Sequence, residues 1–323
     1  MINFAVIGRN FIVDWFLAAA SEFSELRFLG VYSRTPEAAL EFANKNNAEK
    51  IYNTIDEMCN DPELDMVYIA SPNICHEEQA LKLLSAQKHV FCEKPSTLSY
   101  KSLKKMLAAA EENNCVFMEG LVPLHMPAFE KIKSLLTEIG AVRHISFSFC
   151  QYSSRYDKFK QGIKLNTFDP TLGNGAFMDL GIYCIEFMIA LFGYPEKISG
   201  AAHFLPQSID AVGNLSILYT DKTADITFSK ISNTSLPSQI QGENGCILID
   251  SMSRPKKITL VKKDGEKIEF DTTTKRHEMS YELETFIKQL KGEKISVYNK
   301  ISLLAMKFCD EARDILGIDF KIH

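Results

Sequence analysis

The chain has no apolar run that approaches the ~20 residues of a membrane-spanning helix. Its 8 cysteines are scattered and include no CxxC pair, which argues against a disulfide framework and against a zinc or other metal site. It also lacks an excess of positive charge, because 36 Lys and Arg residues stand against 41 Asp and Glu residues. A formal net charge of −5 gives no overall attraction for nucleic acid, so we expect neither a nucleic-acid nor a membrane partner.

What the sequence does contain is enough apolar material for a sizeable core. Of its 323 residues, 46% are hydrophobic and 24% are charged, as is usual for globular proteins. This length favours two domains over one. The first segment, Met1 to Ile7, is too short for a signal peptide and runs directly into an expected strand, so a cytoplasmic location is the default expectation.

Short apolar runs alternate with helical patterns over the first 120 residues. Strands are expected at 2–7, 27–32, 66–70, 89–92 and 116–119, and helices at 11–21, 36–46, 76–85 and 99–113. Alternation at this spacing predicts an α/β domain of the Rossmann type, a doubly wound parallel sheet with helices on both faces.

The pattern changes after Pro123. Helices are expected at 127–139, 179–192, 278–291 and 302–316, and residues 141–151 alternate like a strand at an exposed edge. Between residues 197 and 270 several short strands are separated by turn signals such as Asn244-Gly245. Regular short strands with such turns predict an antiparallel sheet in a second domain.

The first expected strand ends in Gly8, and the loop after it keeps only the first glycine of the Gly-x-Gly-x-x-Gly fingerprint. Asn10 stands at the second position and Val13 at the third. Because Asn tolerates φ > 0 better than other non-glycine residues, a tight turn stays feasible. Gly8, Asn10, Phe11 and Ile12 are therefore candidate residues for binding a pyrophosphate through backbone N–H groups. An ordinary strand–helix turn is the alternative.

The second expected strand ends at Ser33-Arg34, and no acidic residue occurs there before Glu37. An acidic residue at this place would bind the ribose 2′-hydroxyl of NAD. A hydroxyl and a guanidinium suit a 2′-phosphate instead, so NADP(H) is favoured over NAD(H). The alternative is that Arg34 is a solvated cation.

Short polar residues follow the third expected strand, where Ser71 and Asn73 could line a nucleotide crevice. His76 could act as a base. We favour a structural or cofactor-facing role for it, because its place at the start of a helix disfavours the charged imidazole.

The fourth expected strand closes in Glu93-Lys94-Pro95. A lysine at the carboxyl end of a parallel strand points into the crevice where ligands bind. Glu93 can fix the position of Lys94 or bind a ribose hydroxyl, and the sequence leaves the cis or trans state of Pro95 open. The alternative is a surface lysine in a loop.

Asp179 and Tyr183 follow a glycine-containing stretch, Gly173-Asn174-Gly175. Their i, i+4 spacing places both on one face of the expected helix. Since that helix is otherwise apolar, the carboxylate and the phenol need partners or a polar cavity. A buried structural Asp–Tyr pair is the alternative.

Five motifs occur in this order along the chain: the Gly8 loop, Ser-Arg, Ser-Pro-Asn-x-x-His, Glu-Lys-Pro and Gly-x-Gly-x-x-x-Asp-x-Gly-x-Tyr. Together they resemble the glucose–fructose oxidoreductase / inositol dehydrogenase / MocA-like (Gfo/Idh/MocA) family. The resemblance covers nearly the whole chain. It implies an NADP-binding Rossmann domain at residues 1–120 and an α+β domain at residues 121–323 for substrate and oligomerisation. The second domain would carry a large open, mostly antiparallel sheet. An arrangement in which the C-terminal helix packs back on the first domain stays open.

The resemblance also implies an NAD(P)-dependent oxidoreductase that transfers hydride between nicotinamide and a hydroxyl or carbonyl carbon. It matches Lys94 and Asp179 to the family's catalytic positions, and the Gly-Ile-Tyr of the dihydrodiol dehydrogenase-like subgroup matches Tyr183 as the acid/base. The implied partners are a sugar, polyol, dihydrodiol or carbonyl substrate and further copies of the chain, as a dimer or tetramer. A non-catalytic sensor of NADP(H) or of a sugar is the alternative, and the substrate, direction and oligomer size stay open.

Overall fold

The computed structural model describes residues 1–320, and the chain forms two compact units. The first unit comprises Met1–Gly120 together with Arg276–Leu303, and the second comprises Leu121–Lys275 and the chain from Leu304 onward. Helix α11 (Val297–Leu316) contributes residues to both. Within the described residues no helix combines the length and apolarity needed to cross a bilayer.

Six parallel strands form the sheet of the first unit, in the order β3-β2-β1-β4-β5-β6. They are β1 (Ile2–Ile7), β2 (Leu26–Tyr32), β3 (Lys50–Tyr52), β4 (Met66–Ile69), β5 (His89–Cys92) and β6 (Phe117–Glu119). The predicted doubly wound parallel sheet is confirmed, and β3 is an additional short edge strand. The strand order reverses between β1 and β4, the point at which ligands bind in such sheets, beyond the carboxyl ends of the strands.

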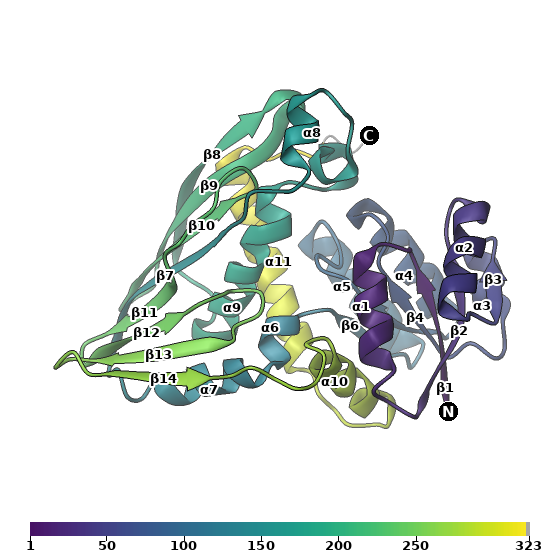
Figure 1. The fold of residues 1–323 in the computed structure, drawn as a ribbon, viewed down its shortest axis with the longest axis horizontal. Helices are drawn as coiled ribbons and strands as arrows, with labels where there is room; N and C mark the ends of the chain where they lie inside the picture. The colour runs from purple at the N-terminus through teal and green to yellow at the C-terminus, as the bar shows by residue number, and fades with distance from the viewer. Residues whose placement is uncertain (321–323) are drawn as a thin grey trace. The chain divides into compact units, whose positions relative to one another are not determined.

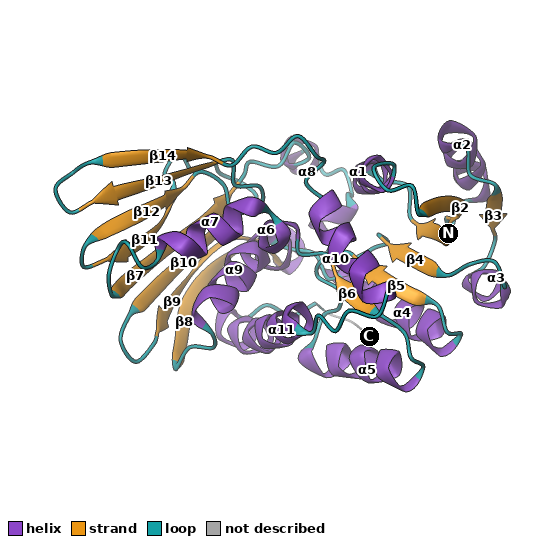
Figure 2. Ribbon diagram, turned by 90° about the horizontal axis from the view of Figure 1, so that it is seen from below, coloured by secondary structure: helices purple, strands orange, loops and turns teal. Residues whose placement is uncertain are grey.

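Helices cover both faces of this sheet (Figures 1 and 2). They are α1 (Phe11–Ala20), α2 (Pro36–Asn46), α3 (Ile55–Asn60), the short turn η1 (Asn73–Cys75), α4 (His76–Ser85), α5 (Tyr100–Glu112) and α10 (Ser280–Leu290). Helices α1 and α10 lie side by side, and so do α4 and α5. In the core, Phe16 stacks on Tyr68 with ring centroids 3.8 Å apart, and Phe91 stacks on Phe286 at 5.3 Å. Phe286 shows why the segment after Arg276 belongs with the first unit.

The second unit contains an eight-stranded sheet in the order β14-β13-β12-β11-β7-β10-β9-β8. Its strands are β7 (Val142–Cys150), β8 (Lys197–Leu205), β9 (Ile209–Leu218), β10 (Thr223–Ser229), β11 (Ser238–Gly242), β12 (Gly245–Ile249), β13 (Lys257–Lys262) and β14 (Lys267–Asp271). All neighbours are antiparallel except β7 and β10. The predicted mostly antiparallel sheet is therefore confirmed.

The expectation of an exposed edge strand at residues 141–151 was wrong. Strand β7 lies inside the sheet, paired with β10 on one side and β11 on the other. Its alternation reflects one buried and one more exposed face of the sheet. Both partner strands come much later in the chain, so a local pattern could not reveal the pairing.

Helices cover one face of the second sheet, and the other face is open (Figures 1 and 2). The helices and turns of this unit are α6 (Val122–His125), α7 (Pro127–Leu135), α8 (Tyr156–Lys160), η2 (Asn166–Phe168), η3 (Pro170–Leu172), η4 (Phe177–Gly181), α9 (Ile182–Phe192), η5 (Pro206–Ser208) and the later part of α11. On the covered face Phe187 makes edge-to-face contacts with Phe129 and Phe147. On the open face Asn214, Ser216 and Leu218 are exposed along β9.

Candidate functional site

The loop after β1 forms a tight turn that needs glycine at its first position. Gly8 has φ +111°, and a β-carbon there would lie 2.7 Å from the carbonyl oxygen of Ala70. Asn10 has φ −80°, so the turn does not use the left-handed conformation that the sequence had suggested for it. Its Oδ1 instead caps α1, accepting the N–H groups of Ile12 at 3.1 Å and Val13 at 3.4 Å. Phe11, the first residue of α1, is 55% exposed.

Ser33 and Arg34 lie directly beyond the carboxyl end of β2, on the loop before α2. Arg34 is exposed, and within residues 1–320 it has no carboxylate partner. Burial raises the pKa of the Cys75 thiol while the charge of Arg34 opposes that shift, so the loops after β2 and β4 are neighbours. An uncompensated guanidinium at the edge of a Rossmann sheet can hold an anion.

His76 is 1% exposed and ties two loops together. Its Nδ1 lies 2.9 Å from the carbonyl oxygen of Pro95, and its Nε2 lies 2.9 Å from that of Ser71. Burial lowers the pKa of His76, and the two carbonyl contacts oppose this. These contacts favour the structural role of His76. Asn73 begins the short turn η1, which connects the Ser71 loop to His76 at the start of α4.

The Glu-Lys-Pro turn follows β5, and the Lys94–Pro95 peptide bond is cis. Glu93 accepts a hydrogen bond from the buried hydroxyl of Tyr68. Glu119, at the end of β6, accepts the N–H of Ser96 at 2.6 Å. Burial raises the pKa of Glu119, and the charge of Lys94 is among the influences that lower it. Sequence reasoning gave Glu119 no role, although its place at the end of a strand was a usable signal.

In the second unit, Asp179 lies on η4, which is a π-helical turn, and Tyr183 lies on the first turn of α9. The wider π turn changes the register of Asp179 against Tyr183 from that of the regular helix that the spacing predicts. Such turns are frequent at functional sites. The ring of Phe149 contacts Tyr183 edge-on at 5.4 Å, which helps to fix the phenol.

Two charged residues near Asp179 were missed by sequence reasoning. Lys230, 3% exposed, forms an ion pair with Asp179, with Nζ 2.9 Å from Oδ2. Asp210, 2% exposed, accepts the N–H of Phe177 at 2.7 Å, at the start of η4. Burial raises the pKa of Asp210 to about 6, although the N–H donors and Lys230 lower it. Neither residue belongs to a recognisable motif: Asp210 is the second residue of β9, and Lys230 follows directly on β10, which already contains Asp225.

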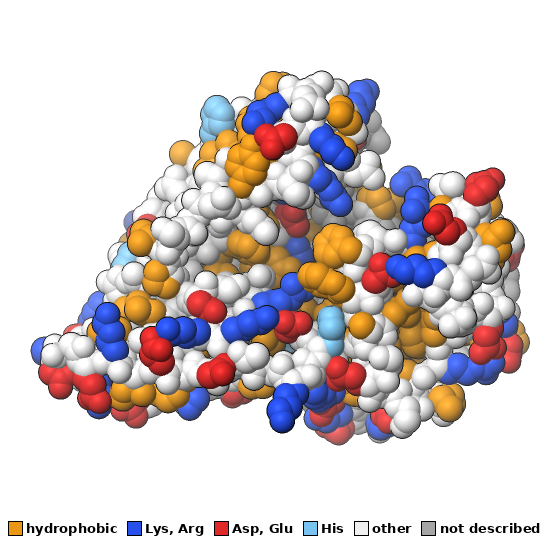
Figure 3. Space-filling model, in the orientation of Figure 1, with side chains coloured by type: hydrophobic (Ala, Val, Ile, Leu, Met, Phe, Trp, Pro, Cys, Tyr) orange, Lys and Arg blue, Asp and Glu red, His pale blue; other side chains and the backbone are white. Residues whose placement is uncertain are grey.

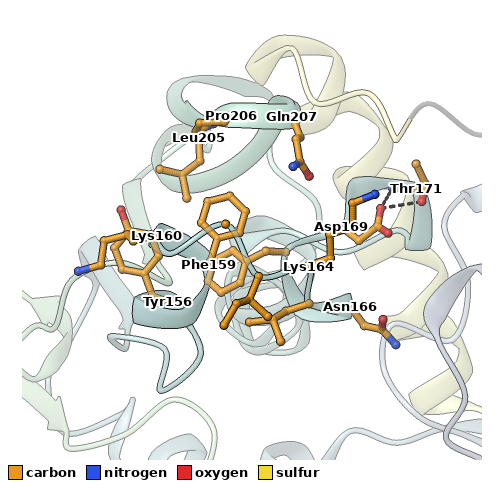
Figure 4. A pocket seen from close by; sticks show the side chains of 14 residues that line it. Tyr156, Phe159, Lys160, Lys164, Asn166, Asp169, Thr171, Leu205, Pro206 and Gln207 are labelled. Atoms are coloured by element: carbon orange, nitrogen blue, oxygen red, sulfur yellow. Dashed lines mark hydrogen bonds between the residues drawn. The ribbon is translucent and has the colours of Figure 1, made fainter.

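A pocket of about 800 Å³ lies in the same unit, between the α8–η3 segment and the end of β8 (Figure 4). Phe159 lies at its middle, and Leu205, Pro206 and Gln207 lie to one side. Further polar residues at the pocket are Lys160, Lys164, Asn166, Asp169 and Thr171. An aromatic wall with polar groups around it suits a ring that carries hydroxyl groups.

Further observations concern which ligands the two units could bind. Within residues 1–320 no group of three or more His, Cys, Asp and Glu side chains could hold a metal ion. On the face drawn in Figure 3, side chains of both charge signs are interspersed. The Gly8 turn and the open Arg34 fit a phosphorylated dinucleotide. The candidate cofactor residues lie on the first unit, and Asp179 and Tyr183 lie on the second.

A Rossmann sheet with these motifs and a second unit with an open sheet define an NAD(P)-dependent oxidoreductase. Residues 2–121 match the family described as "Oxidoreductase family, NAD-binding Rossmann fold", and residues 129–248 match the GFO/IDH/MocA C-terminal domain. The chain belongs to the Gfo/Idh/MocA oxidoreductase family. The predicted family, fold class and class of activity are confirmed.

Curated relatives match along almost the entire length. Scyllo-inositol 2-dehydrogenase (NADP(+)) IolU of Bacillus subtilis (strain 168) is 39% identical over 98% of this chain and 98% of its own. Trans-1,2-dihydrobenzene-1,2-diol dehydrogenase of Xenopus tropicalis is 28% identical over 90% of each chain. These relatives include the subgroup to which the Gly-Ile-Tyr motif pointed.

Solved structures share the fold. KijD10, a 3-ketoreductase from Actinomadura kijaniata determined with NADP and TDP-benzene, superimposes with a TM-score of 0.87. The identity is 22%, and 98% of each chain is covered. At this identity the likeness supports the fold alone.

Proposed function

We propose that this protein is an NADP(H)-dependent dehydrogenase or reductase acting on a hydroxyl or carbonyl carbon of a cyclic polyol or sugar. The observation that carries the proposal is the placement of Asp179 and Tyr183 on consecutive turns of one segment, with the Asp179 side chain 39% exposed. A sensor that only binds its ligand needs no such proton-transfer groups. The proposal therefore favours an enzyme over the non-catalytic alternative.

Oxidation of an alcohol releases a hydride and a proton, and bound nicotinamide supplies the hydride chemistry. Tyr183 takes the proton from the substrate oxygen during oxidation and returns it during reduction. A lysine ammonium favours tyrosinate and polarises a carbonyl, which is the role we assign to Lys94. Asp179 accepts a hydrogen bond from a neighbouring substrate hydroxyl.

We assign the cofactor to the first unit. We assign Gly8, Asn10, Phe11 and Ile12 to the pyrophosphate, and Ser33 and Arg34 to the 2′-phosphate. Ser71, Asn73, His76, Glu93 and Lys94 complete the proposed set, with His76 acting by holding the loops around the nicotinamide end. The support for NADP(H) is the Arg34 guanidinium, which has no carboxylate partner among residues 1–320, together with the relative whose name includes NADP(+).

A substrate panel follows from the relatives and from the pocket. The 39% identical relative carries scyllo-inositol in its name, and the Xenopus tropicalis relative carries a trans-dihydrodiol. Both compounds are six-membered rings with adjacent hydroxyl groups. Inositols come first in the panel, followed by trans-dihydrodiols, aldoses and the corresponding ketones.

The decisive test is Tyr183→Phe, assayed by NADPH formation or consumption. General acid–base catalysis is worth ~10²–10⁴-fold, so kcat is expected to fall by at least about tenfold while NADPH binding persists. Tyr281→Phe, in the first unit, is the matched control. Unchanged turnover in a folded Tyr183→Phe protein would remove the tyrosine from the mechanism. Absence of turnover by the wild type on the whole panel, with NADPH still bound, would favour the sensor.

The open face of the second sheet is proposed to pair with another copy of the chain, giving a dimer or tetramer. Leu218 is 40% exposed on this face. Leu218→Lys should lower the mass measured by light scattering, and a monomeric wild type would contradict the assignment.

A cytoplasmic location is proposed because the cysteines are free thiols. Cell fractionation tests it.

A further inference from the structure

Lys230 is a buried cation at a place where an apolar residue would be expected. It follows directly on β10, and it is 3% exposed. Its Nζ lies 2.9 Å from Oδ2 of Asp179 and donates to the carbonyl oxygen of Thr167 at 3.1 Å. The ring centroid of Phe168 is 5.5 Å from the same Nζ. Lysine is almost never buried without such partners, because removing an ammonium from water is costly.

The ion pair is buried at one end and open at the other. The Lys230 side chain is 4% exposed, whereas that of Asp179 is 39% exposed. Lys230 holds Oδ2 from the buried end of the pair, which restricts the orientation of the carboxylate. A carboxylate held in this way presents acceptor lone pairs toward solvent or a ligand.

Three other charged or titratable groups lie near the pair, on β9, before α8 and on α9. Asp210 on β9 is close enough for the charge of Lys230 to lower its pKa. Arg155, before α8, donates from Nη1 to Oγ1 of Thr167, the residue whose carbonyl oxygen accepts from Lys230. Tyr183 is the phenol on the following helix. Lys230 is thus the cation that offsets two carboxylates.

Lys230 also joins the pair to the pocket. Residues on both sides of Thr167, namely Asn166 and Phe168, line the pocket. The backbone contact to Thr167 and the contact with the Phe168 ring therefore set the distance between Asp179 and the pocket wall.

We propose that Lys230 is a positioning residue that keeps Asp179 ionised and aimed, so that the enzyme selects substrates with a hydroxyl adjacent to the reacting carbon. The inference rests on the proposed function and deepens it by naming the substrate class: vicinal diols and α-hydroxy ketones, as opposed to isolated alcohols. A fixed carboxylate left without its hydrogen-bond donor penalises a substrate that lacks the adjacent hydroxyl.

The experiment compares Lys230→Met and Lys230→Arg with wild type on two substrates, a cyclic polyol and its analogue without the adjacent hydroxyl. In wild type the hydroxyl should raise kcat/KM by about 100-fold or more. In Lys230→Met this ratio should fall below about tenfold, because the carboxylate is neither fixed nor held ionised. The acid limb of kcat/KM should also move to higher pH, and Lys230→Arg should restore most of both properties.

Lys222→Met is the matched control, because Lys222 is another partly buried lysine of the same unit, paired with Asp221 over two aromatic rings. It should leave the substrate ratio and the acid limb unchanged. The inference is overturned if Lys230→Met keeps the wild-type ratio and pH profile, or if the control lowers the ratio equally.

A double-mutant cycle keeps the inference separate from the proposed function. Lys230→Met and Asp179→Asn are combined, and urea unfolding measures their coupling in the unfolding equilibrium constant. A coupling of about tenfold or more, persisting to about pH 5, is expected for an ionised pair. Coupling below about twofold overturns the inference whether or not the enzyme is active. If the cycle shows coupling but the wild-type protein turns over no substrate, the proposed function and the proposed substrate selectivity are refuted. The ion pair between Lys230 and Asp179 is still supported in that case.

Discussion

The carboxylate of Asp210 occupies the space that a side chain on Gly175 would need. A β-carbon built on Gly175 would lie 1.8 Å from Oδ1 of Asp210. The same carboxylate accepts the N–H groups of Ala176 and Phe177, which begin the turn that carries Asp179. A residue of β9 thus caps the turn that carries Asp179, and it can approach closely only because position 175 has no side chain.

Gly175→Ala should therefore unfold or displace the turn. Either Asp210 moves and leaves N–H groups unsatisfied in the core, or the turn shifts, and we expect a loss of about 3 kcal/mol or more in unfolding free energy. Gly265→Ala is the control for backbone strain alone, since Gly265 has φ +92° and nothing within 4 Å of a β-carbon. That variant should lose only about 1–2 kcal/mol. Urea unfolding measures both, and equal losses would contradict the role of Asp210.

The pKa of Asp210 predicts a pH-dependent stability. Burial raises this pKa from 3.8 to about 6, so the folded state binds the proton more tightly than the unfolded state. Protonated Asp210 makes its full contribution to the unfolding free energy below about pH 4, and this contribution is lost as the pH rises through about 6. Relative to wild type, Asp210→Asn should therefore gain about 3 kcal/mol between about pH 4 and pH 7. Urea unfolding across this range checks it, and a constant difference would mean an ordinary pKa.

Local patterns sufficed where local chemistry decides the structure. Helix α2 spans Pro36–Asn46, the range that the sequence predicts, and begins with a proline, which is favoured at the first position of a helix. The interior position of β7 was not predictable, because its neighbours β10 and β11 come from much later in the chain. The segment from Arg276 groups with the first unit through contacts such as Phe286 on Phe91, and such contacts between residues far apart in the chain leave no local pattern.

The candidate site shows the same contrast. Motifs located Lys94, Asp179 and Tyr183, because each follows a recognisable turn or strand end. Asp210 lies within β9 and Lys230 follows directly on β10, and neither belongs to a motif, so they come near Asp179 only because β9 and β10 pack beside η4. The spacing of Asp179 and Tyr183 indicated a regular helix, whereas a capping carboxylate from another strand accompanies a π turn. The residues that hold Asp179 in place come from other strands, so they can be recognised only in the folded structure.

The cofactor assignment predicts an asymmetric effect of Arg34. Arg34→Ala should weaken NADPH by at least about tenfold, because charge-assisted contacts to a phosphate are among the stronger hydrogen bonds, and it should leave NADH nearly unchanged. Arg27→Ala is the control, since that arginine is paired with Glu49. Fluorescence titration with both nucleotides gives the ratio. Equal losses for both would place the 2′-phosphate elsewhere.

A substitution at Asn10 can distinguish an effect on the stability of the loop after β1 from an effect on its affinity for NADPH. Asp caps a helix about as well as Asn, so Asn10→Asp should keep the contacts to Ile12 and Val13 and change stability by less than about 0.5 kcal/mol. The added carboxylate should nevertheless weaken NADPH at least about tenfold, because it repels a pyrophosphate at the same N–H groups. Thr54→Asp adds the same charge at the N-cap of α3, where Thr54 accepts the N–H of Glu57 at 3.1 Å, and should leave binding unchanged. Calorimetric titration with NADPH decides the matter: full affinity in a stable Asn10→Asp protein would show that the phosphates do not contact this turn.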